Sequence, residues 1–216
     1  MKSKNNNNGF TLIELLVVIS ILGILMGIVG PKVIDLLSGS EKTKVQTIVR
    51  GWVTQLHQYK SHYGYFPPFL LTGEEGIAVE LGDEGNLKNF LISLKGKALN
   101  DDGTWEPIES GNEQNRKAKE FHSFSSDEFD SEGKLIGANN IGILVDQNGD
   151  GLIELDPSLS NDILQSLTID YSASEIQAVD VEKFGRIREK VAIFLLQDDD
   201  LDVQNVYSWN VEKFFE

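Results

Sequence analysis

The chain has 216 residues, of which 40% are hydrophobic and 25% charged, a balance typical of one globular domain with an appendage rather than of a disordered polymer. Its formal net charge is −15, whereas a nucleic-acid-binding surface must present lysine and arginine to phosphates, so nucleic acid is not an expected partner. The absence of cysteine excludes disulfides, thiolate metal sites and cysteine nucleophiles.

The N-terminal segment has the charge and hydropathy of a leader followed by a membrane helix. Residues 1–9 carry two lysines and no acid, and an apolar run follows over residues 10–33. Roughly 20 apolar residues in a helix suffice to cross a bilayer, and the lysines favour a cytoplasmic N-terminus. An ordinary secretory signal has its small cleavage-site residue after the apolar run, whereas here Gly9 precedes it. We therefore predict a leader peptide at 1–9 and one transmembrane helix at 10–33.

Glu14 places a carboxylate inside this apolar run. A charge within a membrane helix costs about 2.5–3.5 kcal/mol on insertion scales, so such a residue usually has a partner. If the chain is cut between Gly9 and Phe10, the simplest partner is the new α-amino group of Phe10 on a neighbouring copy, because opposite charges attract strongly at low dielectric. Glu14 would then set the register between subunits.

The segment GFTLIELLVVISILGIL, with Gly9, Phe10, Thr11, Glu14 and the later Pro31, resembles the leader and helix of type IV pilins and type II secretion pseudopilins. The resemblance implies cleavage by a prepilin peptidase between Gly9 and Phe10, N-methylation of Phe10, and packing of the apolar helices into a filament core. It also implies a single-pass inner-membrane protein with a periplasmic head. Its partners would be copies of itself, other pseudopilins and an inner-membrane assembly platform.

Pro31 lies within the helical pattern, where it removes one backbone hydrogen bond and either kinks or ends the helix. Apolar residues recur beyond it at steps of three and four, which favours a helix that resumes as an amphipathic half over residues 34–63. The recurring residues are Val45, Ile48, Val49, Trp52, Leu56, Tyr59 and Tyr63. We expect this stripe to pack on a soluble domain of the same chain.

Gly64 and two following prolines end the helical pattern, and residues 64–216 are expected to form a globular head. The segment from about 71 to 130 is an insert relative to the smallest pseudopilins. Within it we expect a helix at 86–94, a turn at 100–103 and a polar helical stretch near 112–124.

Four later runs are rich in β-branched and aromatic residues and are separated by turn formers, which predicts an antiparallel sheet. They are Ile141–Val145, Leu152–Leu155, Val191–Leu196 and Asn205–Trp209. The last two resemble the C-terminal hairpin of pseudopilins. The expected fold class is therefore α+β, with a long N-terminal hydrophobic helix, transmembrane in its first half and amphipathic in its second, packed on one face of a small antiparallel sheet.

A candidate calcium loop lies in the segment VDQNGDGLIELD. Asp146, Asn148 and Asp150 stand at alternate positions, which directs three oxygens inward, and Leu152 can offer its carbonyl. The twelfth position is Pro157 and not the bidentate glutamate of an EF-hand, so Asp156 and Glu154 are the candidates to replace it. A metal-free turn of Asp, Asn and Gly residues explains the same sequence.

A second acidic cluster lies in the loop of the C-terminal hairpin, where major pseudopilins resemble one another in binding calcium. Its members are Asp198, Asp199, Asp200 and Asp202. A solvated run of charge is the alternative explanation. At either loop, calcium would be structural, because it would tie together carboxylates that otherwise repel one another.

The sequence gives no support for an enzyme. His57 and His62 are five residues apart, which does not place them on one face of a helix, and neither a nucleophile motif nor a phosphate-binding loop is present. The expected function is therefore structural: a subunit of a type II secretion pseudopilus or a related type IV pilus-like filament. The alternative is a minor pilin whose head binds a surface, a sugar or a secreted substrate, for which an exposed aromatic patch on the insert would be the sign.

Overall fold

The computed structural model describes residues 12–130, 133–167, 171–196 and 205–215, except that the side chains of Glu14 and of residues 23–41 lie outside this description. The chain divides into two compact units, residues 1–41 and residues 42–216, and we call the second unit the head. Helices and an antiparallel sheet make the head an α+β fold, which confirms this part of the predicted fold class.

Helix α1 runs from Leu12 to Tyr63 and does not end at Pro31, so the helix continues beyond this proline as expected. It ends at Gly64, whose φ of +88° is a conformation that glycine adopts without strain. Within the head, five of the seven residues of the predicted apolar stripe are buried, whereas Ile48 and Tyr63 are partly buried. Val45, Val49, Trp52, Leu56 and Tyr59 are each at most 4% exposed.

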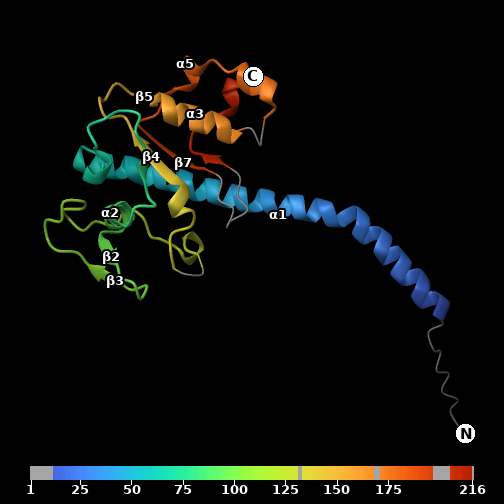
Figure 1. Cartoon of the computed structure of the whole chain (residues 1–216). Helices are drawn as coiled ribbons and strands as arrows, with labels where there is room; N and C mark the ends of the chain where they lie inside the picture. The colour runs from blue at the N-terminus through green and yellow to red at the C-terminus, as the bar shows by residue number, and fades with distance from the viewer. Residues whose placement is uncertain (1–11, 131–132, 168–170, 197–204, 216) are drawn as a thin grey trace, which may run out of the picture. The chain divides into compact units, whose positions relative to one another are not determined.

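An antiparallel sheet with the strand order β1-β4-β7-β8 forms the centre of the head (Figure 1). Its two central strands are β4 (Ile141–Val145) and β7 (Val191–Leu195), which pair over their full length of five residues. The edge strands β1 (Val79–Glu80) and β8 (Val206–Tyr207) have two residues each. The predicted strand at 141–145 is confirmed, and the C-terminal pair is shorter than predicted.

The remaining predicted strand lies outside this sheet. The run at 152–155 contributes β5 (Ile153–Glu154), which pairs with β6 (Arg186–Ile187) in a separate two-stranded sheet. The fold also contains elements that the sequence did not predict. These are the helices α3 (Pro157–Ser166), α4 (Ala173–Gln177) and α5 (Val181–Phe184), and the 3-10 turns at Pro68–Leu70, Ser126–Glu128, Ala138–Asn140 and Glu212–Phe214.

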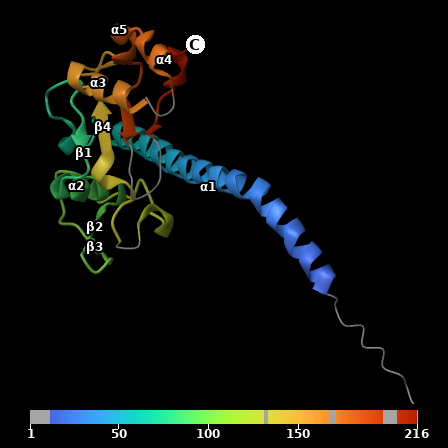
Figure 2. The ribbon, with the colours of Figure 1, turned by 45° about the vertical axis from the view of Figure 1, so that its right-hand side comes forward.

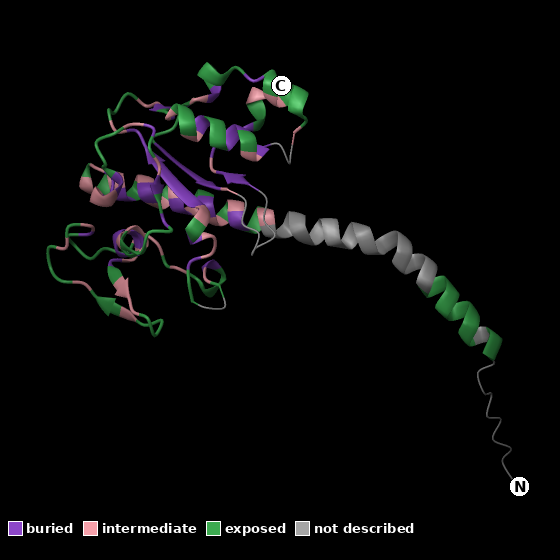
Figure 3. Ribbon diagram, viewed as in Figure 1, coloured by how far each residue is buried: buried purple, intermediate pink, exposed green. Residues whose placement is uncertain are grey.

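Both faces of the central sheet are covered, not one face as expected. Alternate residues such as Ile143 and Ile193 pack with the α1 stripe and α2, whereas Leu144 and Phe194 pack with α3 and α5. Figure 2 shows α3 and α5 on one side of β4 and α2 on the other. Every residue of β4 and β7 is therefore buried, as the purple strands in Figure 3 show. Strands covered on both faces are expected to be continuously apolar.

The insert begins as predicted. Helix α2 (Glu84–Lys95) contains the expected helix and starts at Asp83, whose carboxylate accepts a hydrogen bond from the backbone N–H of Asn86 at 3.0 Å. The predicted turn near residue 100 joins β2 (Lys97–Leu99) to β3 (Trp105–Pro107) in an antiparallel hairpin.

The prediction of a polar helix near residues 112–124 is wrong, because the structure has turns there. The buried side chain of Asn115 forms hydrogen bonds with backbone groups of this segment and of α2. Its Nδ2 donates to the carbonyls of Ser93 and Lys119 at 2.9 and 2.7 Å, and its Oδ1 accepts from Lys119 N and from the Tyr63 hydroxyl at 2.9 and 2.7 Å. Side-chain bonds to nearby backbone compete with helix formation.

Glu128 connects the insert to the α1 stripe through a buried carboxylate, only 5% exposed. Trp52 Nε1 donates to Oε2 at 2.7 Å, His122 Nε2 lies 2.7 Å from the same oxygen, and the backbone N–H of Ser125 donates to Oε1 at 2.9 Å. Burial alone raises the pKa of a carboxyl group, but these hydrogen bonds outweigh it and hold the pKa of Glu128 below its usual value.

We expect Glu128→Gln to lower the free energy of unfolding by about 1–3 kcal/mol near neutral pH, because Trp52 and His122 lose a charged partner. Since the pKa of Glu128 is lowered in the folded state, its stabilisation is complete above the unfolded pKa of about 4.3 and is lost as the pH falls through the folded-state value. The deficit of the variant should therefore shrink in acid. Urea unfolding followed by tryptophan fluorescence at several pH values measures it, and a deficit independent of pH would contradict the expectation.

Candidate functional site

The first described turns of α1 present an apolar surface to solvent. Nine large apolar side chains between Leu12 and Leu22 are 45–88% exposed. The polar side chain of Ser20 donates to the carbonyl of Leu16 in its own helix at 2.7 Å, so it needs no external partner. Contiguous exposed apolar surface of this kind marks an association site for protein or membrane.

The predicted processing and assembly residues belong to the same end of the chain. Gly9 and Phe10 lie outside the described residues, as do the side chains of Glu14 and Pro31, so their roles stay predictions. Within the part of the chain whose side chains are described, no helix has the length and apolar character of a membrane span.

The predicted calcium loop lies between β4 and β5 and begins with a buried carboxylate. Asp146 is 4% exposed, and its two oxygens accept hydrogen bonds from the backbone N–H groups of Gly149 and Gly151 at 2.6 and 2.9 Å. Asp150 is exposed and accepts from Leu152 N at 2.8 Å. Backbone N–H groups of the loop thus bond to both aspartates, of which Asp146 is buried and Asp150 is exposed.

Glu75 joins these two aspartates from a distant part of the chain. One oxygen each from Glu75, Asp146 and Asp150 lies within 4.8 Å of the others. Burial, followed by the negative charges of Asp146 and Asp150, raises the pKa of Glu75 above its usual value. Glu75 is not predictable from the sequence, because its 71-residue separation from Asp146 gives no local spacing signal.

The other predicted ligands are placed differently. Asn148 turns its side chain to the loop itself: its Oδ1 accepts from Asp150 N at 2.8 Å, and its Nδ2 donates to Asp150 Oδ2 at 3.2 Å. Asp156 is not in the carboxylate group and instead caps α3, where it accepts from Ser158 N at 2.9 Å. The second predicted cluster, Asp198, Asp199, Asp200 and Asp202, lies outside the described residues.

A family model for the prokaryotic N-terminal methylation motif matches residues 4–30, which include Gly9, Phe10 and Glu14. The chain carries the N-terminal signature of type IV pilins and pseudopilins. This finding confirms the resemblance seen in the sequence, and it supports a type IV pilin-like substrate of a prepilin peptidase. No curated protein and no solved structure matched the chain with significance.

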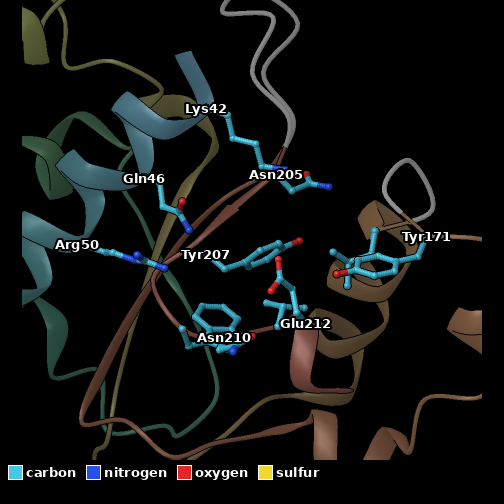
Figure 4. Close-up of a pocket in the computed structure, with 11 residues that line it drawn as sticks. Lys42, Gln46, Arg50, Tyr171, Asn205, Tyr207, Asn210 and Glu212 are labelled. Carbon is cyan, nitrogen blue, oxygen red and sulfur yellow. The ribbon is translucent and has the colours of Figure 1, made fainter. Parts of the chain in front are cut away.

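The head of this pilin-like chain has a cavity of about 210 Å³ beside the second half of α1 (Figure 4). Lys42, Gln46 and Arg50 of α1 line one side, and Tyr207 and Glu212 from the C-terminal segment line another. The lining mixes both signs of charge with aromatic rings. It therefore selects no single class of ligand.

The aromatic side chains of the insert pack inward and do not form an exposed patch among the described residues. Trp105 stacks on Phe124 with ring centroids 5.8 Å apart, and both pack against the core cluster that contains Trp52. Among the described residues of the head, the exposed large apolar side chains are Leu71, Ile77 and Val181. The sign expected of a surface-binding or sugar-binding minor pilin is therefore not found in this part of the chain.

The three histidines have separate surroundings. His57 packs near Phe66, His62 Nδ1 lies 3.3 Å from Lys119 Nζ, and His122 contacts Glu128. Burial lowers the pKa of His57 below its usual value. Each histidine thus has a packing or hydrogen-bonding partner of its own, and no two of them share one of these partners.

Proposed function

We propose that this chain is a structural subunit of a type II secretion pseudopilus or of a related type IV pilus-like filament. The observation that carries the proposal is the methylation motif at residues 4–30, because it leads directly into a helix whose described apolar side chains between Leu12 and Leu22 are exposed. Such a surface is costly in water, and burial against lipid or against the same helix of other copies removes the cost.

We propose that the subunit matures and assembles in three steps. A prepilin peptidase cuts between Gly9 and Phe10 while the helix crosses the inner membrane with its head in the periplasm. The new amino group of Phe10 is methylated. The helices of many copies then pack into a filament core at an inner-membrane assembly platform, with Glu14 of one copy paired to the amino group of its neighbour.

The head contributes structure rather than chemistry in this proposal. Its buried stripe on the part of α1 beyond residue 41 packs in one core cluster with the central sheet. The buried carboxylate of Glu128 is occupied by structural hydrogen bonds with Trp52, Ser125 and His122. We therefore propose no enzymatic activity.

The first expected result is a mature chain that begins at N-methylated Phe10. Intact mass and N-terminal sequencing of the protein extracted from the membrane of its native host should show the loss of residues 1–9 and the addition of one methyl group. A chain that begins at Met1, or one cut after the apolar run, would contradict processing as a prepilin.

A pair of leader variants makes this test specific. Gly9→Leu places a large side chain at the cleavage position, so residues 1–9 should be retained and filaments should be lost. Asn8→Ala changes the neighbouring residue with little change in size and should leave cleavage unaffected. If Gly9→Leu were processed like the native chain, the proposed cleavage position would be wrong.

A further inference from the structure

The carboxylates of Glu75, Asp146 and Asp150 lie close together, and no lysine or arginine among the described residues forms an ion pair with them. Their closest oxygens lie within 4.8 Å of one another. The ion pairs found among the described residues involve other carboxylates, and none joins a lysine or arginine to these three. Like charges at this spacing repel one another, so a counter-charge at this place would stabilise the fold.

Glu75 supplies the observation that points to a ligand. The side chain as a whole is partly buried, but its Oε1 is buried and has no hydrogen-bond partner, and one oxygen of the same carboxylate lies within 4.8 Å of an oxygen of each aspartate. A buried carboxylate oxygen without a partner is costly, and native proteins rarely leave one unsatisfied. The oxygens of Asp146 and Asp150 each accept one N–H, which leaves a further lone pair on each for a ligand.

The backbone holds Glu75 in this position. Gly76 has a φ of +78°, and a Cβ added to it would lie 2.0 Å from the carbonyl oxygen of Glu154, so the chain can approach β5 this closely only with glycine. The carbonyl of Gly76 accepts a hydrogen bond from Asp156 N at 3.2 Å. Asp156, expected from the sequence to be a ligand, thus helps to fix the segment that carries one.

We propose that Glu75, Asp146 and Asp150 form a calcium site that ties the segment before β1 to the loop between β4 and β5. The donor set contains only oxygen, which suits a hard cation and not zinc or copper. Calcium accepts six to eight oxygens in a flexible arrangement, so three carboxylates from two segments, completed by carbonyls and water, fit calcium better than the strict octahedron of magnesium. The site is independent of filament assembly.

The test is a calcium titration of the full chain in detergent after removal of metals with a chelator. Isothermal calorimetry with CaCl₂ should show binding in the range of extracellular calcium modules, about 0.1–1 mM, and the melting temperature should rise with calcium concentration. MgCl₂ should bind about tenfold more weakly. No calcium binding up to several millimolar, or tighter binding of magnesium, would overturn the proposal.

Glu75→Gln is the decisive variant, and Glu74→Gln is its matched control, because the two residues are neighbours and lose the same charge. Glu74 is exposed and outside the carboxylate group. Glu75→Gln should weaken calcium binding about tenfold or more, as should Asp150→Asn on the exposed side of the loop, whereas Glu74→Gln should bind like the native chain. Equal binding by Glu75→Gln and Glu74→Gln would place the ion elsewhere and overturn the proposal.

The melting temperature of Glu75→Gln in chelator shows whether the substitution affects only the metal site or also the stability of the fold. In chelator, Glu75→Gln removes repulsion among the three carboxylates, so its melting temperature should equal or exceed that of the native chain. Only the rise with calcium should disappear. A variant that melts lower in chelator and still gains the full calcium-dependent rise would show that Glu75 supports packing and not the ion.

Discussion

Trp52→Ala should destabilise the head by about 3–5 kcal/mol, the usual cost of removing a buried tryptophan. Trp52 is 1% exposed, lies edge-on to Phe90 with ring centroids 5.4 Å apart, and donates to the buried carboxylate of Glu128. The substitution therefore opens a cavity between α1 and α2 and also removes one of the donors that keep Glu128 charged. Urea unfolding monitored by the fluorescence of Trp105 and Trp209 measures the loss.

Two further variants separate these effects. Trp52→Phe keeps an aromatic ring and much of the volume but removes the indole N–H, so it should cost about 1–3 kcal/mol, less than Trp52→Ala. Thr54→Ala lies on the exposed face of the same helix, where the hydroxyl bonds only to the carbonyl of Arg50, and should change stability by less than about 0.5 kcal/mol. A cost for Trp52→Ala no greater than that of Thr54→Ala would show that the α1 stripe does not hold the head together.

Glu14→Ala should abolish filament assembly while leaving cleavage after Gly9 normal. In the proposed filament, the carboxylate pairs with the amino group of Phe10 on the neighbouring copy. Removing one member leaves that amino group unpaired at low dielectric, which typically costs about 3–5 kcal/mol per contact. Since every subunit of a polymer repeats the contact, even part of this loss would prevent growth. Electron microscopy of sheared filaments, with immunoblots of membrane protein, measures assembly against expression.

Ser20→Ala is the matched control for Glu14→Ala. Ser20 is an exposed polar residue among the apolar side chains of the same part of α1, but its hydroxyl already bonds to the carbonyl of Leu16. Its removal should leave filament number unchanged. Normal filaments from Glu14→Ala at equal protein level would contradict the pairing of Glu14 with a neighbouring subunit.

The sequence predicted those parts of the fold that have a strong local period. The α1 stripe repeats at three and four residues because one side of the helix lies on the sheet, and β4 and β7 are continuously apolar because both of their faces are covered. Helix α2 carries its own start and stop signals in Asp83 and Gly96. In each case the residues that indicate the element lie within it or directly beside it.

Some parts that the sequence did not predict depend on contacts between residues far apart in the chain. Another part, α3, has a local helix-start signal that also fits a metal ligand. Asp156 followed by Pro157 is a typical helix start, and it marks α3, but the aspartate was interpreted as a metal ligand. The turns around Asn115 depend on that side chain reaching the end of α2. Glu75 reaches the loop between β4 and β5 only through the folded chain, so its part in the candidate site required the structure.

The two-residue edges of the central sheet have a consequence for how copies of the chain can associate. Long exposed edges invite addition of a strand from another molecule, the first step towards amyloid-type stacking. Here β1 and β8 each offer only two residues of ladder, while the five-residue strands β4 and β7 lie inside the sheet. In the described part of the chain, the broad apolar surface open for self-association is that of the N-terminal helix. In the proposed filament, self-association would therefore run through this helix and not through the edges of the sheet.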